Sequence, residues 1–536
     1  MIKFGKGLLA SLFCAAMLCF SVLPCFAAEL YTNADLQTVM QEILSWKKRN
    51  VGSEENLLTP EFVSGAGSAA ADWYAMTLGR VGEQDDYAVY LALLQANVEA
   101  RYQTPGKLDA QKATEWHRIA LTVLALGGDP TAFGTDGNGA AINLIADGTY
   151  DRSKTAPLGA QGLNAYIWAL ITLDSKGYPV PDGAADTRET MLDAIVAGQL
   201  NDGGFSLDGE TSDVDITAMA LQALSSYTED DTISESVEKG LVFLSEQQGL
   251  DGDFVSWGEA NPESTAQVLV ALCTLGIDPE NDSRFIKNGN HVLDGLMKYR
   301  TEQGGFAHSV TGDLAGVPNS LTSEQVLYAL CALYRYRTGL RSLYDMRPET
   351  SQQPAGTIYS IFEGGNVSSG LLFSENDLQV YRALPQPLTG EQYTRVLYLY
   401  TKLTMAENSG EYAQLLPDLT EKKETVENIY REVENINAEI AAYLYPFTNI
   451  TRNDKEQVLA LTARVDKLSD YDKQQILGLE DLYRAKVKLT SDWRAVWIWV
   501  IAAILVTILV AVLIWRVQKK KRLQGKNNEF LENEDW

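Results

Sequence analysis

Two aspartates near the middle of the chain, Asp213 and Asp215, have the spacing of a proton-transfer site. They stand between a glycine-rich turn and an alanine- and leucine-rich stretch, in NDGGFSLDGETSDVDITAMALQALSSY (residues 201–227). A carboxyl group that is buried, or close to a second carboxylate, keeps its proton at neutral pH and can act as a general acid. Glu263 has the corresponding place in the next stretch of this kind and can supply that second carboxylate. Asp215 and Asp213 are therefore the candidate catalytic residues.

The same position is polar in most of the similar stretches along the chain. The residue nine places before the final leucine is Ala69 in the first stretch, and in the others it is His117, Gln161, Asp215, Glu263 or Glu324. If these stretches are neighbouring helices with axes about 8–10 Å apart, the polar side chains can converge on one bound molecule. The predicted ligand-binding residues are these five polar residues with the aromatic Trp116, Trp168 and Trp257.

A purely structural explanation of the acids stays open beside these two. Ser212-x-x-Asp215 has the pattern of a capping box, in which two side chains satisfy the free N–H groups of a helix start. Asn261-Pro262-Glu263 combines a capping residue, a first-turn proline and an acid that the helix dipole favours. Structural caps, ligand binding and proton transfer are thus three alternatives for the same residues.

The candidate residues need an array of helices to position them. Apolar residues recur at helical spacing over residues 35–339 and indicate six helical hairpins. The predicted pairs are 35–49 with 68–80, 86–102 with 114–126, 139–147 with 158–173, 187–200 with 213–227, 234–247 with 262–275, and 288–300 with 320–337. The second helix of each pair is rich in small residues, which allow close approach to neighbours. We expect the second helices to form an inner ring and the first helices an outer one.

Repeated turns before the inner helices carry a family resemblance. The turns Asp202-Gly203-Gly204-Phe205, Asp251-Gly252-Asp253-Phe254 and Gln303-Gly304-Gly305-Phe306 share one place in their repeats, and a glutamine precedes the first two. Glycine supplies the positive φ of such a turn. Repeated Q-x-x-x-G-x-(W/F) turns before alanine-rich helices resemble those of the prenyltransferase and squalene-cyclase repeat superfamily. The resemblance implies an all-α fold, an α6/α6 toroid over residues 28–340.

The resemblance also sharpens the catalytic hypothesis. Class II terpene cyclases carry D-x-D-D-T-A in an inner helix, and its middle acid protonates the substrate. The segment 213–218 matches that motif except that Ile216 replaces the last acid, and Asp215 stands at the position of the proton donor. Those enzymes usually pair two helical barrels, whereas this chain has the repeats of one.

Other relatives imply different ligands. Protein prenyltransferases bind zinc near the starts of the inner helices, but no His and Cys spacing here resembles a metal site, so neither a metal nor a cofactor is predicted. Extracellular corrinoid carriers share the toroid and close a small β-domain over the ligand. Residues 357–384 are short for such a domain, yet a corrinoid stays a candidate ligand.

The two ends of the chain predict its location. Residues 1–27 have the lysines, apolar stretch and small residues of a secretory signal peptide. Residues 495–515 are apolar and flanked by tryptophans, as in a transmembrane helix, and the basic tail 516–536 follows. The positive-inside rule predicts a single-pass protein of the cell membrane, with the large N-terminal part extracellular and the C-terminus cytoplasmic.

The remaining segments and the overall charge complete the prediction. Residues 341–385 read as a linker with room for a short β-hairpin, and 386–490 as a helical stalk that resembles spacer modules of bacterial surface proteins. The net charge of −27 argues against nucleic-acid partners. The expected function is binding of a small isoprenoid- or corrinoid-like molecule, or of a surface partner, at the toroid mouth. The alternatives are a terpene-cyclase-like lyase or isomerase with Asp215 as general acid, and a structural spacer.

Overall fold

The computed structural model describes residues 31–531 apart from 104–106, 154, 257, 352, 355, 368–369 and 492. The predicted signal peptide, the last five residues of the tail and Trp257 lie outside the described residues. The chain divides into two compact units, Met1–Ala383 with Thr394–Thr420, and Leu384–Tyr393 with Glu421–Trp536. Each unit is described by itself.

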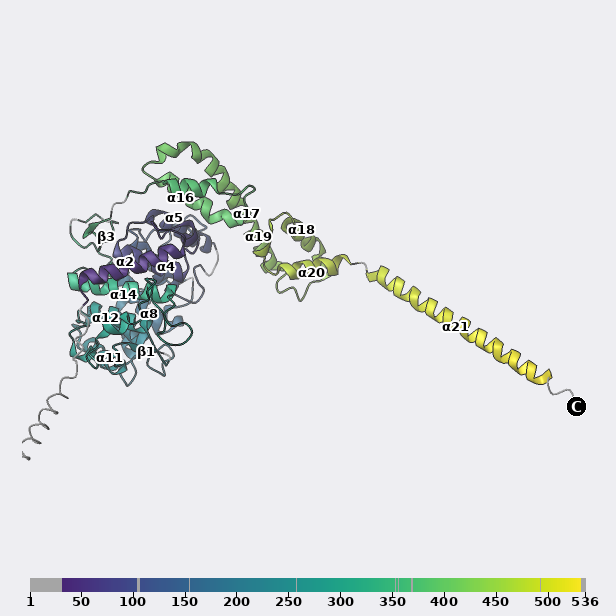
Figure 1. Cartoon of the computed structure of the whole chain (residues 1–536), viewed down its shortest axis with the longest axis horizontal. Coiled ribbons are helices and arrows are strands. Elements are labelled where there is room, and N and C mark those ends of the chain that lie inside the picture. The colour runs from purple at the N-terminus through teal and green to yellow at the C-terminus, as the bar shows by residue number, and fades with distance from the viewer. Residues whose placement is uncertain are drawn as a thin grey trace, which may run out of the picture. The chain divides into compact units, whose positions relative to one another are not determined.

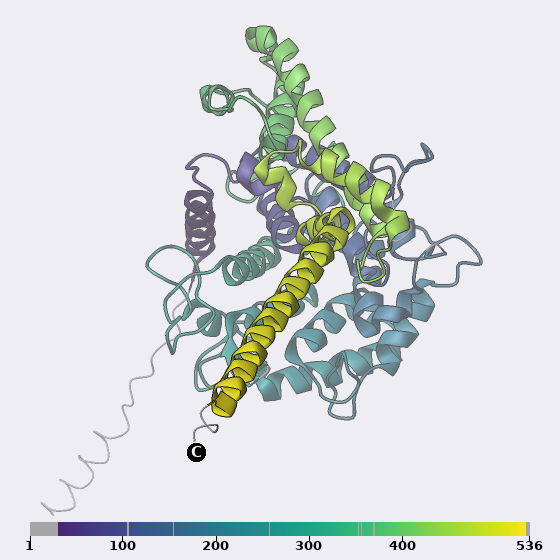
Figure 2. The same cartoon turned by 90° about the vertical axis from the view of Figure 1, so that its right-hand side faces the viewer.

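Six helices of the first unit form a closed inner ring (Figures 1 and 2). They are α4 (Ala69–Val81), α6 (Thr114–Ala125), α8 (Leu163–Asp174), α10 (Val214–Leu224), α12 (Pro262–Thr274) and α14 (Ser320–Thr338). Each packs against the next, and α14 packs against α4, which closes the ring. The predicted all-α fold with an α6/α6 toroid is thereby confirmed.

Outer helices cover the ring. They are α2 (Asn33–Asn50), α5 (Tyr87–Arg101), α7 (Leu144–Gly148), α9 (Arg188–Ala197), α11 (Asp231–Gln247) and α13 (Val292–Met297). Helices α7, α9, α11 and α13 pack against the inner helices α6, α8, α10 and α12 in turn, whereas α2 packs against α14. The first outer helix therefore joins the last inner helix. The predicted hairpins pair each outer helix with the inner helix that follows it, whereas α7, α9, α11 and α13 pack mainly against the inner helix that precedes them. The predicted pairs therefore hold in sequence order but not in these contacts.

The inner helices are more buried than the outer ones, as their many small residues predicted. Eleven of the thirteen residues of α12 are buried, but only Met191 and Ile195 of the ten residues of α9. An inner helix contacts neighbours on both sides and across the ring, so it is apolar nearly all round, whereas an outer helix buries one stripe.

The repeated turns fix where each inner helix begins. The Gln199 amide donates to the Gly203 and Ser236 carbonyls, both at 2.8 Å, and Gln248 makes the matching bonds to Gly252 and Phe285. Each glutamine thus bonds its own turn to the next repeat along the chain, in α11 for Gln199 and shortly before α13 for Gln248. Gly252 has φ +91°, and a Cβ there would lie 2.2 Å from the His291 carbonyl oxygen, so only glycine fits.

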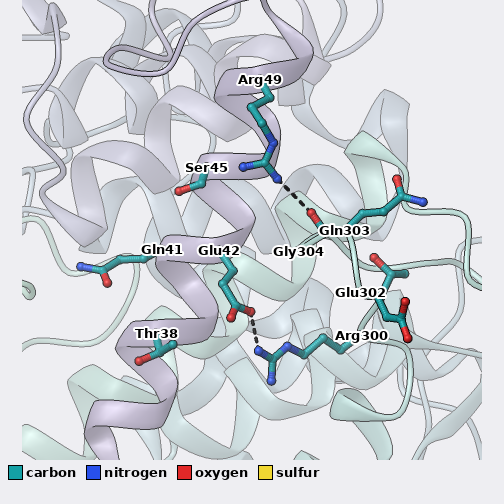
Figure 3. A pocket seen from close by; sticks show the side chains of 10 residues that line it. Thr38, Gln41, Glu42, Ser45, Arg49, Arg300, Glu302, Gln303 and Gly304 are labelled. Carbon is teal, nitrogen blue, oxygen red and sulfur yellow. Dashed lines mark hydrogen bonds and ion pairs between the residues drawn. The ribbon is translucent and has the colours of Figure 1, made fainter.

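The sixth turn uses different residues for the same purpose. The Thr301 hydroxyl donates to the Gly305 carbonyl at 2.8 Å, where the other turns use glutamine. Arg300 instead pairs with Glu42 of α2 at 2.5 Å, and Arg49 donates to the Gln303 carbonyl at 3.0 Å (Figure 3). These contacts, around a surface hollow of about 630 Å³, join the first outer helix to the last repeat.

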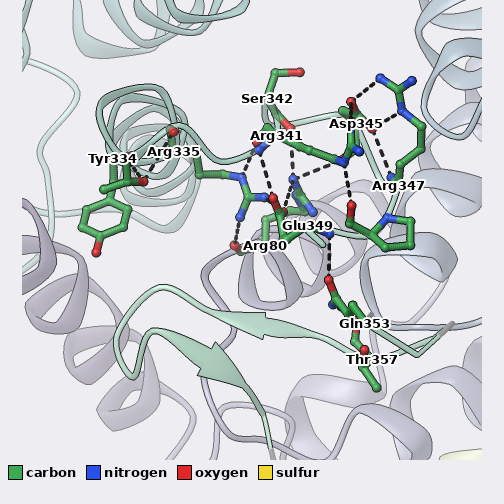
Figure 4. A network of polar contacts seen from close by, with 12 residues as sticks. Arg80, Tyr334, Arg335, Arg341, Ser342, Asp345, Arg347, Glu349, Gln353 and Thr357 are labelled. Atoms are coloured by element: carbon green, nitrogen blue, oxygen red, sulfur yellow. Dashed lines mark hydrogen bonds and ion pairs between the residues drawn. The ribbon is translucent and has the colours of Figure 1, made fainter. Parts of the chain in front are cut away.

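The chain after α14 crosses the C-terminal ends of α4 and α14 as a strap, residues 341–361 (Figure 4). Glu349 pairs with the buried Arg335 and accepts the Arg341 N–H at 3.0 Å. The Arg80 guanidinium donates to the Ser342 and Asp345 carbonyls at 2.9 and 3.1 Å. Strands β3 (Tyr359–Ser360) and β4 (Gly365–Asn366) then form a short antiparallel pair in the segment where a hairpin was expected. The strap therefore belongs to the ring unit.

Two later helices, α15 (Glu375–Arg382) and α16 (Tyr393–Met405), bring a buried cation to the first repeat. The Lys402 ammonium lies 2.7 Å from Asp86 and 3.0 Å from Asp377. The Tyr398 hydroxyl donates to Asp86 at 2.8 Å, and all four side chains are buried. One ammonium thus compensates two buried carboxylates.

The second unit is a small helical module followed by a long helix. Its helices are α17 (Leu416–Tyr443, shared with the first unit), α18 (Lys455–Val465), α19 (Asp470–Gln474), α20 (Leu479–Thr490) and α21 (Trp493–Leu531). Ile436, Ile440, Val458, Leu461 and Leu482 lie in its apolar core. Within α21, Val496–Leu523 is long and apolar enough to cross a membrane, and an 18-residue window in it has a mean hydropathy of 3.0.

Short elements complete the described chain. They are α3 (Pro60–Val63), the 3-10 turns η1 (Leu158–Gln161), η2 (Ser225–Tyr227), η3 (Ser283–Phe285), η4 (Gly390–Gln392), η5 (Ser409–Leu415) and η6 (Arg452–Asp454), and the antiparallel strands β1 (Phe254–Ser256) and β2 (Glu259–Asn261).

Candidate functional site

A cavity of about 470 Å³ opens at the N-terminal ends of the inner helices, and all six of them line it. The lining residues are Ala69, Trp73, Lys112, Thr114, Glu115, Arg118, Gln161, Asn164, Trp168, Ile216, Met219, Gln267, Leu321, Glu324, Gln325, Tyr328 and Tyr344. Its volume falls in the range of small-molecule sites, about 300–1,000 Å³. We call this space the ring cavity.

Aromatic side chains form one wall of the ring cavity. The Trp73 and Trp168 rings lie 5.2 Å apart with their planes at 48°. Tyr344, which the strap contributes, lies 5.5 Å from Trp168 at 83°. Tyr328 of α14 lines the cavity as well. Trp168 thus lies where a ligand contact was predicted, and the strap supplies a residue that the sequence did not single out.

Glu324 places a buried carboxyl group in the same cavity. It is 4% exposed, and the Thr77 hydroxyl donates to it at 3.3 Å. Burial raises the pKa of Glu324 to about 8, a shift that the Thr77 hydrogen bond reduces. The group is therefore mostly protonated at neutral pH and can donate an O–H hydrogen bond.

Two further acids gather beside Tyr328, although neither Asp215 nor Glu263 lines the ring cavity. Burial raises the pKa of Asp215 to about 6, and the negative charges of Asp213 and Glu263 add to the shift, which the nearby Ser264 hydroxyl reduces. The carboxylate of Glu263 is thus close enough to raise the pKa of Asp215, as the sequence predicted. Burial raises the pKa of Tyr328 too, to which Glu324 and these two acids contribute.

Asp213 has a structural role in the described chain. It is the N-cap of α10, where its Oδ1 accepts the Ile216 N–H at 3.0 Å. Its Oδ2 accepts the Ser256 hydroxyl at 2.8 Å. The predicted Ser212-x-x-Asp215 capping box is wrong, because Ser212 donates to Asp202 at 2.6 Å instead.

The cap predicted at the next inner helix is present. Asn261 is the N-cap of α12 and accepts the Ser264 N–H at 2.8 Å, with Pro262 in the first turn. Glu263 accepts a hydrogen bond from the Thr322 hydroxyl and lies 2.9 Å from His308 Nδ1. Glu263 thereby ties α12 to the start of α14.

His117 and Trp116, two of the predicted ligand-binding residues, do not line the ring cavity, and His117 is therefore not at its mouth. The His117 Nε2–H donates to the Gly148 carbonyl at 2.7 Å, and burial lowers the pKa of His117 to about 3. The Trp116 indole donates to the Tyr102 hydroxyl at 2.7 Å. Both residues lie on the side of α6 that packs against α7. They are in close contact with Gly148 of α7, so this side of α6 faces away from the ring cavity.

Gln161 does lie in the cavity wall, where its side chain is already engaged. Its Oε1 accepts the Thr114 N–H at 3.1 Å, and its amide donates to the Thr114 hydroxyl at 2.8 Å. It therefore caps α6, whose own N-cap residue, Ala113, has no side-chain hydrogen bond. Gln161 shapes the mouth, and Asn164 beside it has a buried Oδ1 without a hydrogen-bond partner in the described part of the chain.

A charged network that the sequence did not predict occupies the side of the ring cavity at α6. Arg118 lies 2.9 Å from the fully buried Asp72 and also pairs with Glu115. Burial raises the pKa of Asp72, while the Arg118 charge and the Tyr90 and Gly67 hydrogen bonds oppose the shift. Asp72 lies 46 residues before Arg118, so spacing gave no indication of that pair.

Metal chemistry has no candidate here. Within the described ranges, no group of three or more His, Cys, Asp or Glu side chains is placed to hold a metal ion. Cys273 and Cys331 are buried free thiols, and burial raises the pKa of both.

Comparison with known proteins gives fold neighbours only. No protein family and no curated protein matches the sequence. Among solved structures, an unsaturated glucuronyl hydrolase mutant from Streptococcus agalactiae aligns with 12% identity and a TM-score of 0.38, covering 59% of this chain and 96% of its own. The protein geranylgeranyltransferase-I of Candida albicans aligns with 14% identity and a TM-score of 0.36, covering 56% and 92%. Both neighbours are α/α toroids.

The buried Glu324 predicts a pH-dependent stability. Its folded pKa of about 8 lies above the ordinary glutamate value of 4.5, so between these values the folded chain holds a proton that the unfolded chain has lost. Stability is then highest below pH 4.5 and falls as pH rises towards 8, by up to about 1.4 kcal/mol per pH unit. Glu324→Gln keeps the shape without the titration. Thermal unfolding from pH 5 to 9 should show equal stability at pH 5 and a more stable variant at pH 9. If the stability of the native chain and of Glu324→Gln changes with pH in the same way, Glu324 does not titrate in this range.

Proposed function

We propose that the ring binds a small molecule in the ring cavity. The observation that carries the proposal is the cavity itself, which all six inner helices line with aromatic, amide and carboxyl side chains. A concave site with apolar walls and a few convergent polar groups is the usual form of a ligand site. The mixed lining favours a ligand with both apolar and hydrogen-bonding surfaces over a pure hydrocarbon, and a whole corrinoid is larger than the cavity.

A ligand panel tests this proposal. The full chain in detergent is incubated with a prenyl diphosphate, a corrinoid, neutral sugars and small organic ions, and thermal unfolding is followed. A ligand that binds only the folded state raises the unfolding temperature by mass action. We expect stabilisation by at least one class. If no class stabilises the protein and none co-purifies with it, the structural-spacer alternative is favoured.

Proton transfer by Asp215 is the second candidate function. Its raised pKa and the unpartnered, buried Oδ1 suit a proton donor. Because Asp215 lies outside the cavity lining, such a donor would act through its neighbour Tyr328. Turnover of squalene or a prenyl diphosphate by the native chain, and none by Asp215→Asn, would support a terpene-cyclase-type reaction. Equal turnover by both removes Asp215 from the mechanism.

We also propose that α21 anchors the chain in a cell membrane, with the ring outside and the basic tail in the cytoplasm. The apolar residues 496–515 and the basic residues 516–522 that follow them support this orientation. An amine reagent that cannot cross membranes should label lysines between residues 31 and 490 on intact cells and spare those after 518. The reverse pattern would place the ring inside.

A further inference from the structure

The ring cavity combines an aromatic wall with a carboxyl group that no cation compensates in the described chain. Trp73, Trp168 and Tyr344 present neighbouring rings at 5.2 and 5.5 Å, two of them nearly perpendicular. The face of an aromatic ring carries the negative part of its quadrupole, and all three rings line the ring cavity. A cation within about 6 Å of such faces is attracted by their quadrupoles.

Glu324 adds a specific acid to this wall. The one hydrogen bond found for its carboxyl in the described chain comes from the neutral Thr77 hydroxyl. The charges that act on its neighbour Tyr328 are also acidic, from Asp215 and Glu263. In the described part of the chain, Glu324 itself has no ion-pair partner.

The basic residues of the ring cavity lie on another element and are already engaged or exposed. Arg118 is compensated by Asp72 and Glu115. Lys112 is an exposed residue before α6. At α6 the cavity therefore has a basic side chain that is already paired with acids. At α14, α8 and α4 its described lining residues are acidic, polar, aromatic or apolar, without a basic side chain. Arg118 is also committed to its own acids, which argues against a diphosphate ligand.

We propose that the ligand of the ring cavity is a compact organic cation, a quaternary or primary ammonium seated between the Trp73, Trp168 and Tyr344 rings and the carboxyl of Glu324. This inference rests on the proposed binding function and names its ligand class. The cavity of about 470 Å³ admits a molecule of this size together with an uncharged remainder that reaches the amides at the mouth.

Cation binding is coupled to proton release. An ammonium favours the ionised form of Glu324, so the acid gives up its proton when the cation enters. The groups that face it are Thr77 and Tyr74 of α4, Tyr344 of the strap and Tyr328 of α14. The tyrosines stay neutral, since burial raises the pKa of each. Below a pKa of about 8 for Glu324, affinity should rise up to about tenfold per pH unit.

The test compares choline with 3,3-dimethyl-1-butanol, which has the same shape without the charge. Calorimetric titration of the full chain in dodecyl maltoside is done at pH 6, 7 and 8. We expect choline to bind about 30-fold more tightly than the alcohol at pH 8, the ratio expected of a desolvated cation–π site. Choline affinity should rise with pH, as derived above.

Matched variants assign the effect. Glu324→Gln should abolish the pH dependence of choline affinity. Trp168→Leu should weaken choline binding about tenfold or more but keep its pH dependence. The control Glu302→Gln, at an exposed position, should change neither the affinity nor its pH dependence. Equal affinity for choline and the alcohol, no choline binding, or the same pH dependence in Glu324→Gln overturns the cation inference. If a neutral or anionic panel compound binds instead, the binding function stands and this inference alone falls.

Discussion

Replacing Lys402 by methionine is expected to lower the free energy of unfolding of the ring unit by about 3–5 kcal/mol, because breaking a buried ion network by removing one partner leaves buried charge uncompensated. The ammonium lies 2.7 Å from Asp86 and 3.0 Å from Asp377, and all three residues are buried. Methionine fills a similar volume, so the loss reports charge rather than packing. Urea unfolding of the full chain measures it.

The same substitution at the surface is the control for Lys402→Met. Lys239 pairs with Glu235, and both side chains are more than half exposed. Lys239→Met should therefore cost no more than about 1 kcal/mol. Adding Asp377→Asn to Lys402→Met should recover part of the stability, since one stranded charge is removed. If Lys402→Met costs no more than Lys239→Met, the buried network does not hold α16 to the first repeat.

Ala69→Trp is expected to close the ring cavity and to reduce ligand affinity by at least ~100-fold, equivalent to about 2.7 kcal/mol. Ala69 is the first residue of α4, is exposed and lines the cavity. The large ring would occupy the mouth. Because the site is at the surface, the change should alter stability by no more than about 0.5 kcal/mol. Titration with whichever panel ligand binds the native chain measures the affinity.

Ala70→Trp is the matched control for the closed cavity. Ala70 is the next residue of the same helix and is also exposed, but it does not line the ring cavity. Its tryptophan adds the same bulk and hydrophobicity on another side of α4. Affinity within about twofold of native is expected for Ala70→Trp. Equal losses in both variants would place the ligand elsewhere, and no loss in either would leave the cavity without a role.

The ring could be predicted from the sequence because its evidence is local and repeated. Helical spacing and small residues identified the inner helices. The turns at Gly203, Gly252 and Gly304 require glycine because each has a positive φ, a property of the turn itself that does not depend on distant contacts. The cap at Asn261 was equally local. The identity of the α10 cap was wrong, since Asp213 and Ser212 both have capping side chains, and the helix pairing was wrong because it depends on contacts between repeats.

The site was harder to predict because it depends on how each helix is rotated. Counting nine residues back assumed the same rotation for every inner helix. That assumption holds for Glu324 and Gln161, which line the ring cavity, and fails for His117, which faces α7. Tyr344 comes from the strap, which has no repeat spacing, and the Arg118–Asp72 pair is a contact between two inner helices that the spacing within one helix does not specify.

The central claim is that the ring cavity holds a small molecule, and native mass spectrometry of the full chain purified from its own host tests it most directly. Native protein, Ala69→Trp and Ala70→Trp are compared under identical conditions. The claim predicts a retained small-molecule mass on the native chain and on Ala70→Trp, and its loss from Ala69→Trp. The same mass on all three, or a bare chain in every case, would contradict it.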